Sequence, residues 1–595
     1  MWCFKLEQRL FYNPWYLFVI LFLLHFNQAK AQGDYKPYFR YPMDSLPHFV
    51  SPFGGLRDNH FHSGVDLKTQ EREGLPVYAV ADGYISRIKI ASNGYGKAIY
   101  IDHPNGFTSV YGHLQCYKGA IADWIKQYQY KHEKFAFDTV FKQAIIWVKK
   151  GDTIGLSGNS GGSTGPHLHF EIRETRTEEI WNPGLFGMLP IDSIKPFLSQ
   201  VHFYQFVPEG LLLHKRISIQ QKKLIKRDSV PLYQQVLVYQ DTIDLSPELY
   251  GIGIAGYDYI HQTRDEKGLY DYGLIHHNKK IFGFKLKRFA FSESKFINQH
   301  IDYPWYKLNS QRIQKCFKDD GNTFSMIETN KQKGKIYFQA NQLDSILIYL
   351  GDINDNYTYV QLYIRTSERI ENPEKEKYFQ SIINKPLWRP SIKNKLQFPG
   401  FKLESDIGAI YDTIYLDCYK TESVKNTFAP VYKIHQNLTP LHKSIHLEIE
   451  VKDYNFSDSK YLCFASVNKA GKLNYAGGNF HHNWVKGDIG SFGNYTIAAD
   501  SVPPTAQLLN NKDTTSIRFK IDDSFSGISS YQLYLNNKWV LADYDAKSDL
   551  LVYSFDEVYY MEKAKAILNN EKANWTIKLS DKQGNKLEKN WQLDW

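Results

Sequence analysis

The sequence predicts a mainly β protein with several domains. Its 595 residues exceed what one hydrophobic core can organise, and about 150 residues per domain gives three or four domains. Aromatic residues make up 15% of the chain, including 43 Tyr, and such broad side chains are favoured in strands. Short β-prone runs separated by turn residues recur along the sequence. These features predict folded β domains rather than disorder.

The beginning of the chain, residues 1–31, has the pattern of an export signal. Lys5 and Arg9 precede an apolar stretch over residues 15–26, and Ala29-Lys30-Ala31 provides a small-residue cleavage site. The apolar stretch is about a dozen residues long, which is shorter than the roughly 20 residues that span a bilayer. We therefore expect a cleaved signal peptide rather than an anchor, no membrane span in the mature chain, and a location in the periplasm, in the cell envelope or outside the cell.

A compact antiparallel sheet is predicted for residues 48–187. Its β-prone runs, separated by Asp-Gly and Asn-Gly turns, are residues 77–80, 84–90 and 97–102. The turn Pro104-Asn105-Gly106 allows residues 107–114 to fold back on 97–102 as a hairpin. His113 is thereby predicted at the end of the returning strand.

Residues 117–148 are predicted to form a helical insertion over this sheet. Two helix-compatible stretches, 120–130 and 137–147, precede a turn that begins at Lys149. As a hypothesis, the insertion forms a wall or lid beside His113. Its deletion from a folded protein is then expected to alter activity or specificity.

The rest of the chain is predicted to consist of β domains. Residues 200–500 hold a long series of β-prone runs, which we expect to form two or three β-rich domains. The last segment, residues 503–595, starts after Pro503-Pro504 and has a length that suits one immunoglobulin-like β-sandwich.

Composition excludes several kinds of site. The formal charge of +9 is modest for this length and no dense Lys/Arg run is present, so we expect no nucleic-acid partner. The five cysteines lack any Cys-x-x-Cys spacing, which argues against a thiolate metal site. A disulfide between Cys418 and Cys463 stays open at this point.

Three histidine-bearing segments within residues 48–187 require a joint explanation. They are His62-Ser63-Gly64-Val65-Asp66, Tyr111-Gly112-His113-Leu114 and Gly165-Pro166-His167-Leu168-His169-Phe170-Glu171. Side chains two apart on a strand share a face, so His167 and His169 are expected side by side. A catalytic zinc site uses three protein ligands from imidazole nitrogen and carboxylate oxygen. His62, Asp66 and one of the paired histidines satisfy that count.

The histidines that remain are free to move protons. Zinc lowers the pKa of water from 15.7 to about 7, and a nearby imidazole can take the proton as attack begins. This combination indicates metal-assisted amide hydrolysis.

At these residues the sequence resembles the lysostaphin-type, or β-lytic, family of zinc endopeptidases. The motifs of that family are His-x-Gly-x-Asp, a Tyr-Gly-His-like segment and a His-Leu-His-Phe strand, and the resemblance covers about residues 48–187. It implies a lysostaphin-like metallopeptidase domain with an antiparallel sheet and one zinc ion per chain.

Residue by residue, the resemblance implies specific roles. His62, Asp66 and His169 become the zinc ligands, His167 the general base, and His113 a second catalytic imidazole that steadies the tetrahedral intermediate. All of these positions are filled, whereas degenerate family members that activate other cell-wall hydrolases have lost ligands.

Other features of the same region are weaker signals. His103 and His132 lack the motif context and are expected at the surface. His60 is also expected to face solvent, although its spacing of two from His62 leaves open a role as an alternative ligand or a residue at the rim of the site. The glycine-rich run Gly158–Gly165 permits close approach of backbone to a bound peptide. It lacks a Gly-Lys-Ser/Thr ending and precedes a strand, which excludes a nucleotide-binding loop.

The sequence therefore predicts an exported zinc endopeptidase that hydrolyses peptide crosslinks of peptidoglycan. Its partners would be the peptide stems of the wall and, through the C-terminal β domains, cell-envelope proteins. Two alternatives stay open: a non-catalytic wall-binding scaffold or activator of other hydrolases, and a zinc peptidase that acts on proteins. An adhesin or carbohydrate-binding protein would explain the C-terminal β domains but not the N-terminal histidines.

Overall fold

The computed structural model describes most of the chain. The described residues are 38–44, 49–190, 193–207, 210–219, 224–226, 236–259, 266–319, 321–368, 373–452, 456–510, 515–555 and 572–594. The predicted export signal, residues 1–31, lies outside them. Within these ranges no helix has the length and apolar character needed to cross a membrane.

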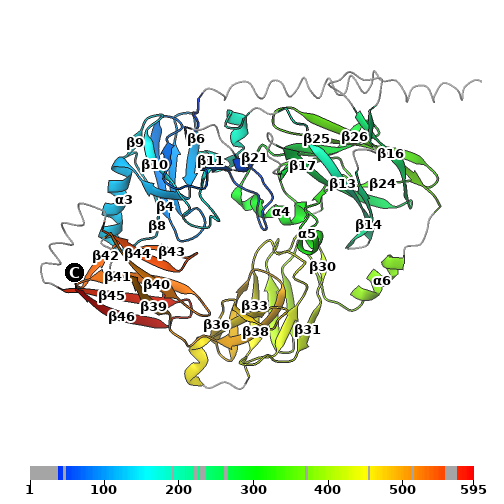
Figure 1. Ribbon diagram of the computed structural model, residues 1–595. Helices are drawn as coiled ribbons and strands as arrows, with labels where there is room; N and C mark the ends of the chain where they lie inside the picture. Colours follow the sequence, from blue (N-terminus) through cyan, green and yellow to red (C-terminus); the bar gives the residue numbers. More distant parts are fainter. Residues whose placement is uncertain are drawn as a thin grey trace, which may run out of the picture.

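The protein is mainly β, as predicted. We distinguish an N-terminal region (49–190), a middle region (193–368), a third region (373–500) and a C-terminal region (505–594). The four follow one another around the molecule, and the last lies beside the first, next to helix α3 (Figure 1). Among the described strands, β16 (Val236–Leu245) and β26 (Tyr357–Thr366) pair in parallel, and the other pairs are antiparallel.

The N-terminal region contains a large sheet in the order β1-β2-β11-β6-β5-β4-β8 and a small sheet β3-β10-β7. The strands are β1 (Phe49–Ser51), β2 (Val65–Lys68), β3 (Pro76–Tyr78), β4 (Gly83–Ile90), β5 (Lys97–Asp102), β6 (Phe107–Gly112), β7 (Leu114–Tyr117), β8 (Phe137–Val140), β9 (Trp147–Val148), β10 (Thr153–Ser157), β11 (His167–Glu174) and β12 (Ile180–Trp181). The predicted hairpin is present as β5 and β6. His113 follows β6 directly with a φ of 58°, so the chain turns sharply there.

The insertion, residues 117–148, is helical only in its first half. Helix α3 (Gly119–His132) buries Ile121 and Ile125 against the sheet. The prediction of a second helix over 137–147 is wrong, because this stretch contains β8 and β9, which both pair with β4. Arg87 on β4 binds Asp138 on β8 through two hydrogen bonds of 2.7 Å. Cross-strand pairing thus outweighs a weak helical preference.

The middle region has two sheets, β14-β13-β17-β18 and β15-β16-β26-β25-β19-β20-β23. Its further strands are β13 (Phe197–Val207), β14 (Gly210–Ser218), β15 (Leu224–Lys226), β17 (Leu249–Tyr259), β18 (Glu266–Lys267), β19 (Asp271–His276), β20 (Lys279–Lys285), β21 (Arg288–Phe289), β22 (Gln314–Lys315), β23 (Ile327–Thr329), β24 (Ile336–Tyr337) and β25 (Leu343–Gly351). Short helices α4 (Ile297–His300) and α5 (Tyr303–Asn309) follow β21.

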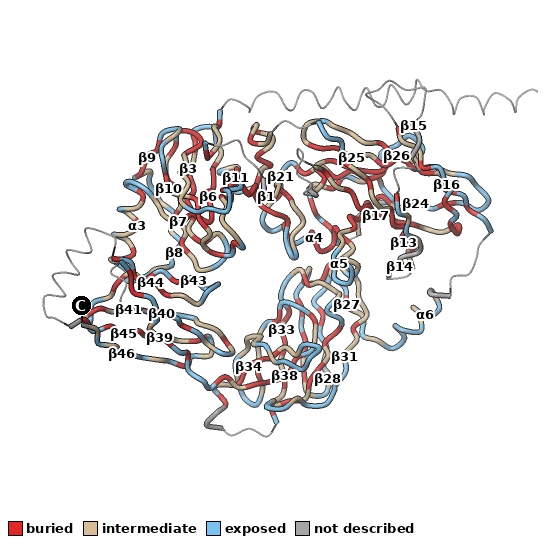
Figure 2. Tube along the Cα trace, in the orientation of Figure 1, coloured by how far each residue is buried: buried red, intermediate tan, exposed pale blue. Residues whose placement is uncertain are grey.

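The N-terminal and middle regions share one hydrophobic core. Strand β21 of the middle region pairs with β12, which extends the N-terminal sheet. Phe61 is fully buried and stacks on Phe324 at a ring-centroid distance of 5.1 Å. Buried segments are concentrated where β1, β11, β21 and α4 meet (Figure 2). The core therefore continues across residues 187–200, the border expected from the sequence.

The third and C-terminal regions each have their own core. The third region contains sheets β28-β29-β33-β37-β36 and β31-β32-β38-β34-β35, and the pair β27-β30. Its elements are α6 (Pro373–Ile382), β27 (Leu387–Trp388), β28 (Asn394–Phe398), β29 (Phe401–Ser405), β30 (Ile414–Tyr415), β31 (Cys418–Thr421), β32 (Val431–Ile434), β33 (Ile445–Glu450), β34 (Leu462–Val467), β35 (Leu473–Tyr475), β36 (Asn479–His481), β37 (Trp484–Ile489) and β38 (Gly493–Ala499). Cys418 and Cys463 are both free thiols, so the disulfide left open by the sequence does not form.

The C-terminal region begins directly after Pro503-Pro504 and packs its two sheets, β39-β40-β44-β43 and β42-β41-β45-β46, around Trp575. The strands are β39 (Thr505–Asn510), β40 (Ser516–Asp522), β41 (Ile528–Leu535), β42 (Lys538–Val540), β43 (Asp543–Asp545), β44 (Leu550–Ser554), β45 (Lys572–Asp581) and β46 (Lys586–Asp594). Trp539 meets Tyr130 of α3 edge to face, with ring centroids 5.3 Å apart. The insertion therefore contacts the last part of the chain.

Candidate metal and catalytic site

Three predicted ligands converge at the start of β2 and β11. The register of these strands places Asp66 directly opposite His169, and His62 lies in the segment that leads into β2. Asp66 Oδ1 lies 3.0 Å from His62 Nε2 and 2.9 Å from His169 Nδ1, and the two nitrogens are 3.2 Å apart. Each of the three residues is at most 5% exposed. Their ligand atoms form a nearly equilateral triangle in the interior.

The opposite ring nitrogens of the two histidines are also bound. His62 Nδ1 donates to the carbonyl oxygen of Pro52 at 2.8 Å, and His169 Nε2 donates to Glu171 Oε1 at 2.8 Å. A ring nitrogen that donates in this way fixes the tautomer and leaves the other nitrogen with its lone pair. In the neutral form of each ring, the second nitrogen then carries its lone pair toward the triangle.

The two other predicted histidines lie beside the triangle. Their ring centroids are 4.7 Å apart, and His167 Nε2 is 3.5 Å from Asp66 Oδ1. Each is held through Nδ1: His113 donates to the carbonyl of Ser160, and His167 to that of Gly165, both at 2.8 Å. Burial, and then the neighbouring charges of His169 and His167, lower the pKa of His113 to about 3. His113 is therefore neutral over the physiological range.

The charge state of the triangle follows from its contacts. Burial opposes ionisation of Asp66, but the charge of His62 and the contacts of the carboxylate with His167 and His169 hold the pKa of Asp66 well below its usual range. Burial likewise opposes protonation of His169, yet Asp66 and Glu171 raise its pKa to about 9, so Nδ1 holds a proton that a bound metal ion would replace. The site is thus built to hold positive charge between two carboxylates.

Sequence reasoning missed the groups that surround the ligands. Glu171 is fully buried; Arg173 pairs with it at 2.6 Å, and Ser63 donates a hydrogen bond to it at 2.6 Å. Arg57 pairs with Asp66 Oδ2 at 2.8 Å, which leaves Oδ1 to face the histidines. For Glu171 a signal existed, since it lies two residues after His169 on the same strand face. For Arg57 no spacing pointed to this contact.

Two of the three histidines predicted at the surface are there, and one is not. His60 and His132 are exposed. The prediction for His103 is wrong: it is 5% exposed and its two nitrogens bind the carbonyl of Asp82 and the hydroxyl of Ser109, each at 2.8 Å. A buried imidazole is stable here because both of its polar atoms are satisfied.

One family model matches the part of the chain that contains this site. Residues 60–131 and 135–183 match the model of peptidase family M23. This part of the chain is a peptidase family M23 domain. The family resemblance inferred from the motifs is thereby confirmed. Outside the M23 domain, residues 387–500 match the model of the Zu5-like domain.

Three curated relatives match parts of the chain. An uncharacterized metalloprotease of Haemophilus influenzae is 32% identical over 185 residues, 29% of this chain and 33% of the relative. The DD-carboxypeptidase/endopeptidase Mpg of Neisseria meningitidis is 36% identical over 128 residues, 21% and 24% of the two chains. The peptidoglycan DD-endopeptidase ShyA of Vibrio cholerae is 31% identical over 144 residues, which cover 23% of this chain and 27% of the relative. The chain thus spans a third or less of the length of these relatives.

Among solved structures, the catalytic domain of lysostaphin from Staphylococcus simulans is 25% identical. That likeness covers 24% of this chain and 91% of the other, with a TM-score of 0.18. A zinc-containing peptidase from Vibrio cholerae is 27% identical, covering 23% and 37%, also with a TM-score of 0.18.

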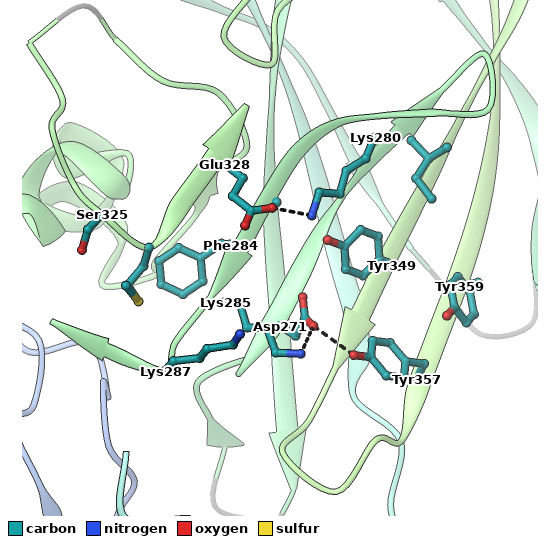
Figure 3. A pocket seen from close by; sticks show the side chains of 13 residues that line it. Asp271, Lys280, Phe284, Lys285, Lys287, Ser325, Glu328, Tyr349, Tyr357 and Tyr359 are labelled. Atoms are coloured by element: carbon teal, nitrogen blue, oxygen red, sulfur yellow. Dashed lines mark hydrogen bonds and ion pairs between the residues drawn. The ribbon is translucent and has the colours of Figure 1, made fainter. Parts of the chain in front are cut away.

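A separate cavity of about 260 Å³ lies on the middle region (Figure 3). Asp271 there accepts a hydrogen bond from Tyr357 at 2.9 Å and pairs with Lys285 at 3.0 Å. Lys280 pairs with Glu328 at 2.7 Å. Both carboxylates of this cavity are therefore paired with its own lysines, whereas Asp66 faces three histidines in addition to its partner Arg57.

Proposed function

We propose that this protein is an exported zinc-dependent endopeptidase that hydrolyses peptide crosslinks of peptidoglycan. The observation that carries the proposal is the triangle formed by His62, Asp66 and His169 within an M23 domain. The Neisseria relative is named a DD-carboxypeptidase/endopeptidase and the Vibrio relative a peptidoglycan DD-endopeptidase, and both names support the substrate class. The peptidoglycan substrate named for the Vibrio relative, together with the signal-like residues 1–31, supports export.

The residues fit one zinc ion. Bonds of about 2.0–2.2 Å in tetrahedral geometry separate two ligand atoms by roughly 3.3 Å. The three separations in the triangle are 2.9–3.2 Å, so small side-chain movements open it to that size. Two imidazoles and one carboxylate are the donor types that zinc prefers, and three ligands leave the fourth position open for catalysis. When bound, zinc supplies Lewis acidity toward the scissile carbonyl and toward water.

The chain's own histidines supply the proton transfers. Because Nδ1 of His113 and of His167 donates to a carbonyl, a ring that carries one proton keeps it on Nδ1 and accepts through Nε2. His167 Nε2 lies closer to the ligand set, and we assign it the role of general base that takes the proton of the attacking water. His113, beside it, would steady the negative charge of the tetrahedral intermediate after its Nε2 has received the proton that His167 took from the water.

The C-terminal two thirds of the chain have a positioning role in this proposal. β-rich regions beyond residue 200 would hold the M23 domain on the wall or on cell-envelope proteins. The peptide stem of the wall is the macromolecular substrate, and nucleic acid is not a partner because no concentrated basic surface is encoded.

The decisive experiment is digestion of purified crosslinked peptidoglycan. The full mature chain is compared with His169→Ala and with a chelated sample re-supplied with zinc. His132→Ala, at an exposed histidine of the insertion, serves as the matched control. We expect soluble muropeptides from wild type and His132→Ala, none from His169→Ala, and recovery by zinc in the wild type alone. Product masses identify the bond.

Two results would redirect the proposal. Zinc bound in a 1:1 ratio without release of muropeptides would favour a wall-binding scaffold or activator. Cleavage of an unfolded protein substrate in preference to the wall would favour a protein-directed peptidase.

A further inference from the structure

One loop orients both proposed catalytic imidazoles. This loop, residues 158–165, is called the glycine loop. The carbonyls of Ser160 and Gly165 accept the Nδ1 protons of His113 and His167. Ser163 Oγ also lies 3.2 Å from His167 Nδ1. Because each ring follows the carbonyl that holds it, the position of the glycine loop sets where both Nε2 atoms lie.

The inner face of the glycine loop is fixed by backbone contact. A Cβ added to Gly158 would lie 2.4 Å from the backbone nitrogen of Gln115, and one added to Gly161 would lie 2.3 Å from that of Gly96. These glycines are therefore required for close approach to the sheet. They also leave the loop with few side chains of its own to anchor its outer face.

The outer face is held by the C-terminal region. Lys547 lies in the turn between β43 and β44, and its ammonium donates to the carbonyls of Asn159 and Ser163, the latter at 3.2 Å. An ammonium group has three donors, so one side chain can bind both carbonyls. Lys547 thus spans the same loop segment that binds His113 and His167 from the other side.

A second contact reaches the loop from β43, the strand that precedes this turn in the C-terminal region. Asp543 on β43 pairs with Lys97 on β5. The backbone nitrogen of Lys97 in turn donates to Ser160 Oγ at 3.0 Å. Around these contacts the two regions enclose a cavity of about 530 Å³, which includes Ser160 and Gly161 in its lining. The glycine loop therefore lies between the catalytic histidines and the C-terminal region.

We propose that the C-terminal region is a positioning element of the active site and that Lys547 is its positioning residue. By binding the carbonyls of Asn159 and Ser163, Lys547 holds the glycine loop where its own carbonyls align His113 and His167. The expected effect of Lys547 on catalysis rests on the proposed function, whereas its effect on the position of the glycine loop does not.

The test uses the full mature chain with Lys547→Ala, Lys547→Arg and the control Lys578→Ala. Lys578 lies in the same region and pairs with Glu588 on the neighbouring strand β46. With a purified crosslinked muropeptide, we expect Lys547→Ala to lower kcat about tenfold, in line with the cost of a small misplacement of catalytic groups. KM should stay within about twofold, zinc content should remain at one per chain, and Lys547→Arg should restore most of kcat because it keeps the donors.

Amide hydrogen exchange gives a readout that does not need activity. Residues 158–165 should exchange faster in Lys547→Ala, and in Asp543→Ala, while they are unchanged in Lys578→Ala. Unchanged exchange with wild-type kcat in Lys547→Ala, or a loss confined to KM, would overturn the positioning role. If wild type cleaves no wall substrate, the proposed function fails, and the exchange data alone decide whether Lys547 holds the loop.

Discussion

Glu171 Oε1 and His169 Nε2 lie 2.8 Å apart on one face of β11, so a buried carboxylate fixes the tautomer of a ligand histidine. The same carboxylate binds Arg173 at 2.6 Å. The negative charge of Glu171 is therefore shared between an ion pair and the ligand set. Removal of that charge must affect both folding and metal affinity.

We expect Glu171→Gln to weaken zinc binding by about 10–100-fold, the usual cost of losing a partner of a ligand histidine. It should also lower the free energy of unfolding by about 3–5 kcal/mol, because Arg173 loses its buried partner. Competition with a chelator and denaturant unfolding measure the two effects. Glu174→Gln, at a partly exposed carboxylate on the same strand, is the control. Equal zinc affinity in both variants would contradict this role of Glu171.

Zinc should stabilise the protein through the triangle. A ligand present at 100 times its dissociation constant adds about 2.7 kcal/mol of stability. We therefore expect calorimetry to show a rise of about 5–10 °C in the transition that includes the M23 domain. Asp66→Asn should abolish this rise, whereas Asp123→Asn, at an exposed carboxylate of α3, should preserve it. A zinc-dependent rise that persists in Asp66→Asn would place the metal elsewhere.

The shared core predicts that a residue of the middle region supports the ligand set. Phe324→Ala removes the ring stacked on Phe61 and should cost about 3–5 kcal/mol, as for other buried Phe side chains. Because Phe61 precedes His62, zinc affinity should fall as well. Tyr337→Ala, at a position that is 61% exposed in the same region, is the control. Zinc affinity unchanged by Phe324→Ala would mean that the M23 domain is independent of the middle region.

Buried His300 should make stability depend on pH. Burial, and then the charge of Lys315, lower its pKa to about 3, against 6.5 in an unfolded chain. The ring also packs on Phe61, Phe284 and Phe324, and binds the hydroxyl of Tyr272. As the pH falls, His300 binds a proton in the unfolded state first. The contribution of neutral His300 to the free energy of unfolding is therefore complete above pH 6.5 and is lost as the pH falls toward 3.

At pH 4.5 this loss amounts to at most about 3 kcal/mol. Denaturant unfolding at pH 7 and pH 4.5 measures it. His300→Gln should lose less stability between the two values than wild type does, and His132→Gln, at an exposed histidine, should behave as wild type. Identical pH dependence in wild type and His300→Gln would show that other groups cause it.

Local patterns in the sequence predicted the parts of the site that depend on strand geometry. The spacing of two between His167 and His169 placed both on one face of a strand, and the turn at Pro104-Asn105-Gly106 produced the β5–β6 hairpin. The family motifs named the residues that meet in the triangle. In each case the determining interaction spans only a few residues or follows a fixed period.

The remaining features depend on contacts between distant segments. Residues 137–140 form a strand because β4 offers an unpaired edge, which the local composition does not reveal. Arg57 binds Asp66, and Lys547 binds the glycine loop, through side chains whose positions follow from packing of whole regions. His103 is buried because the carbonyl of Asp82 and the hydroxyl of Ser109 bind both of its ring nitrogens. Single-sequence periodicity carries none of this information.

The contact between Phe61 and the middle region also has a consequence for biosynthesis. The backbone nitrogen of Phe61 donates to the carbonyl of Ser294, a residue 233 positions later in the chain. A ribosome that adds 5–20 residues per second needs about 10–50 s to reach it. During that time the segment before His62 lacks its partners from the middle region. The nascent chain therefore holds His62 without this support until translation has passed the middle region.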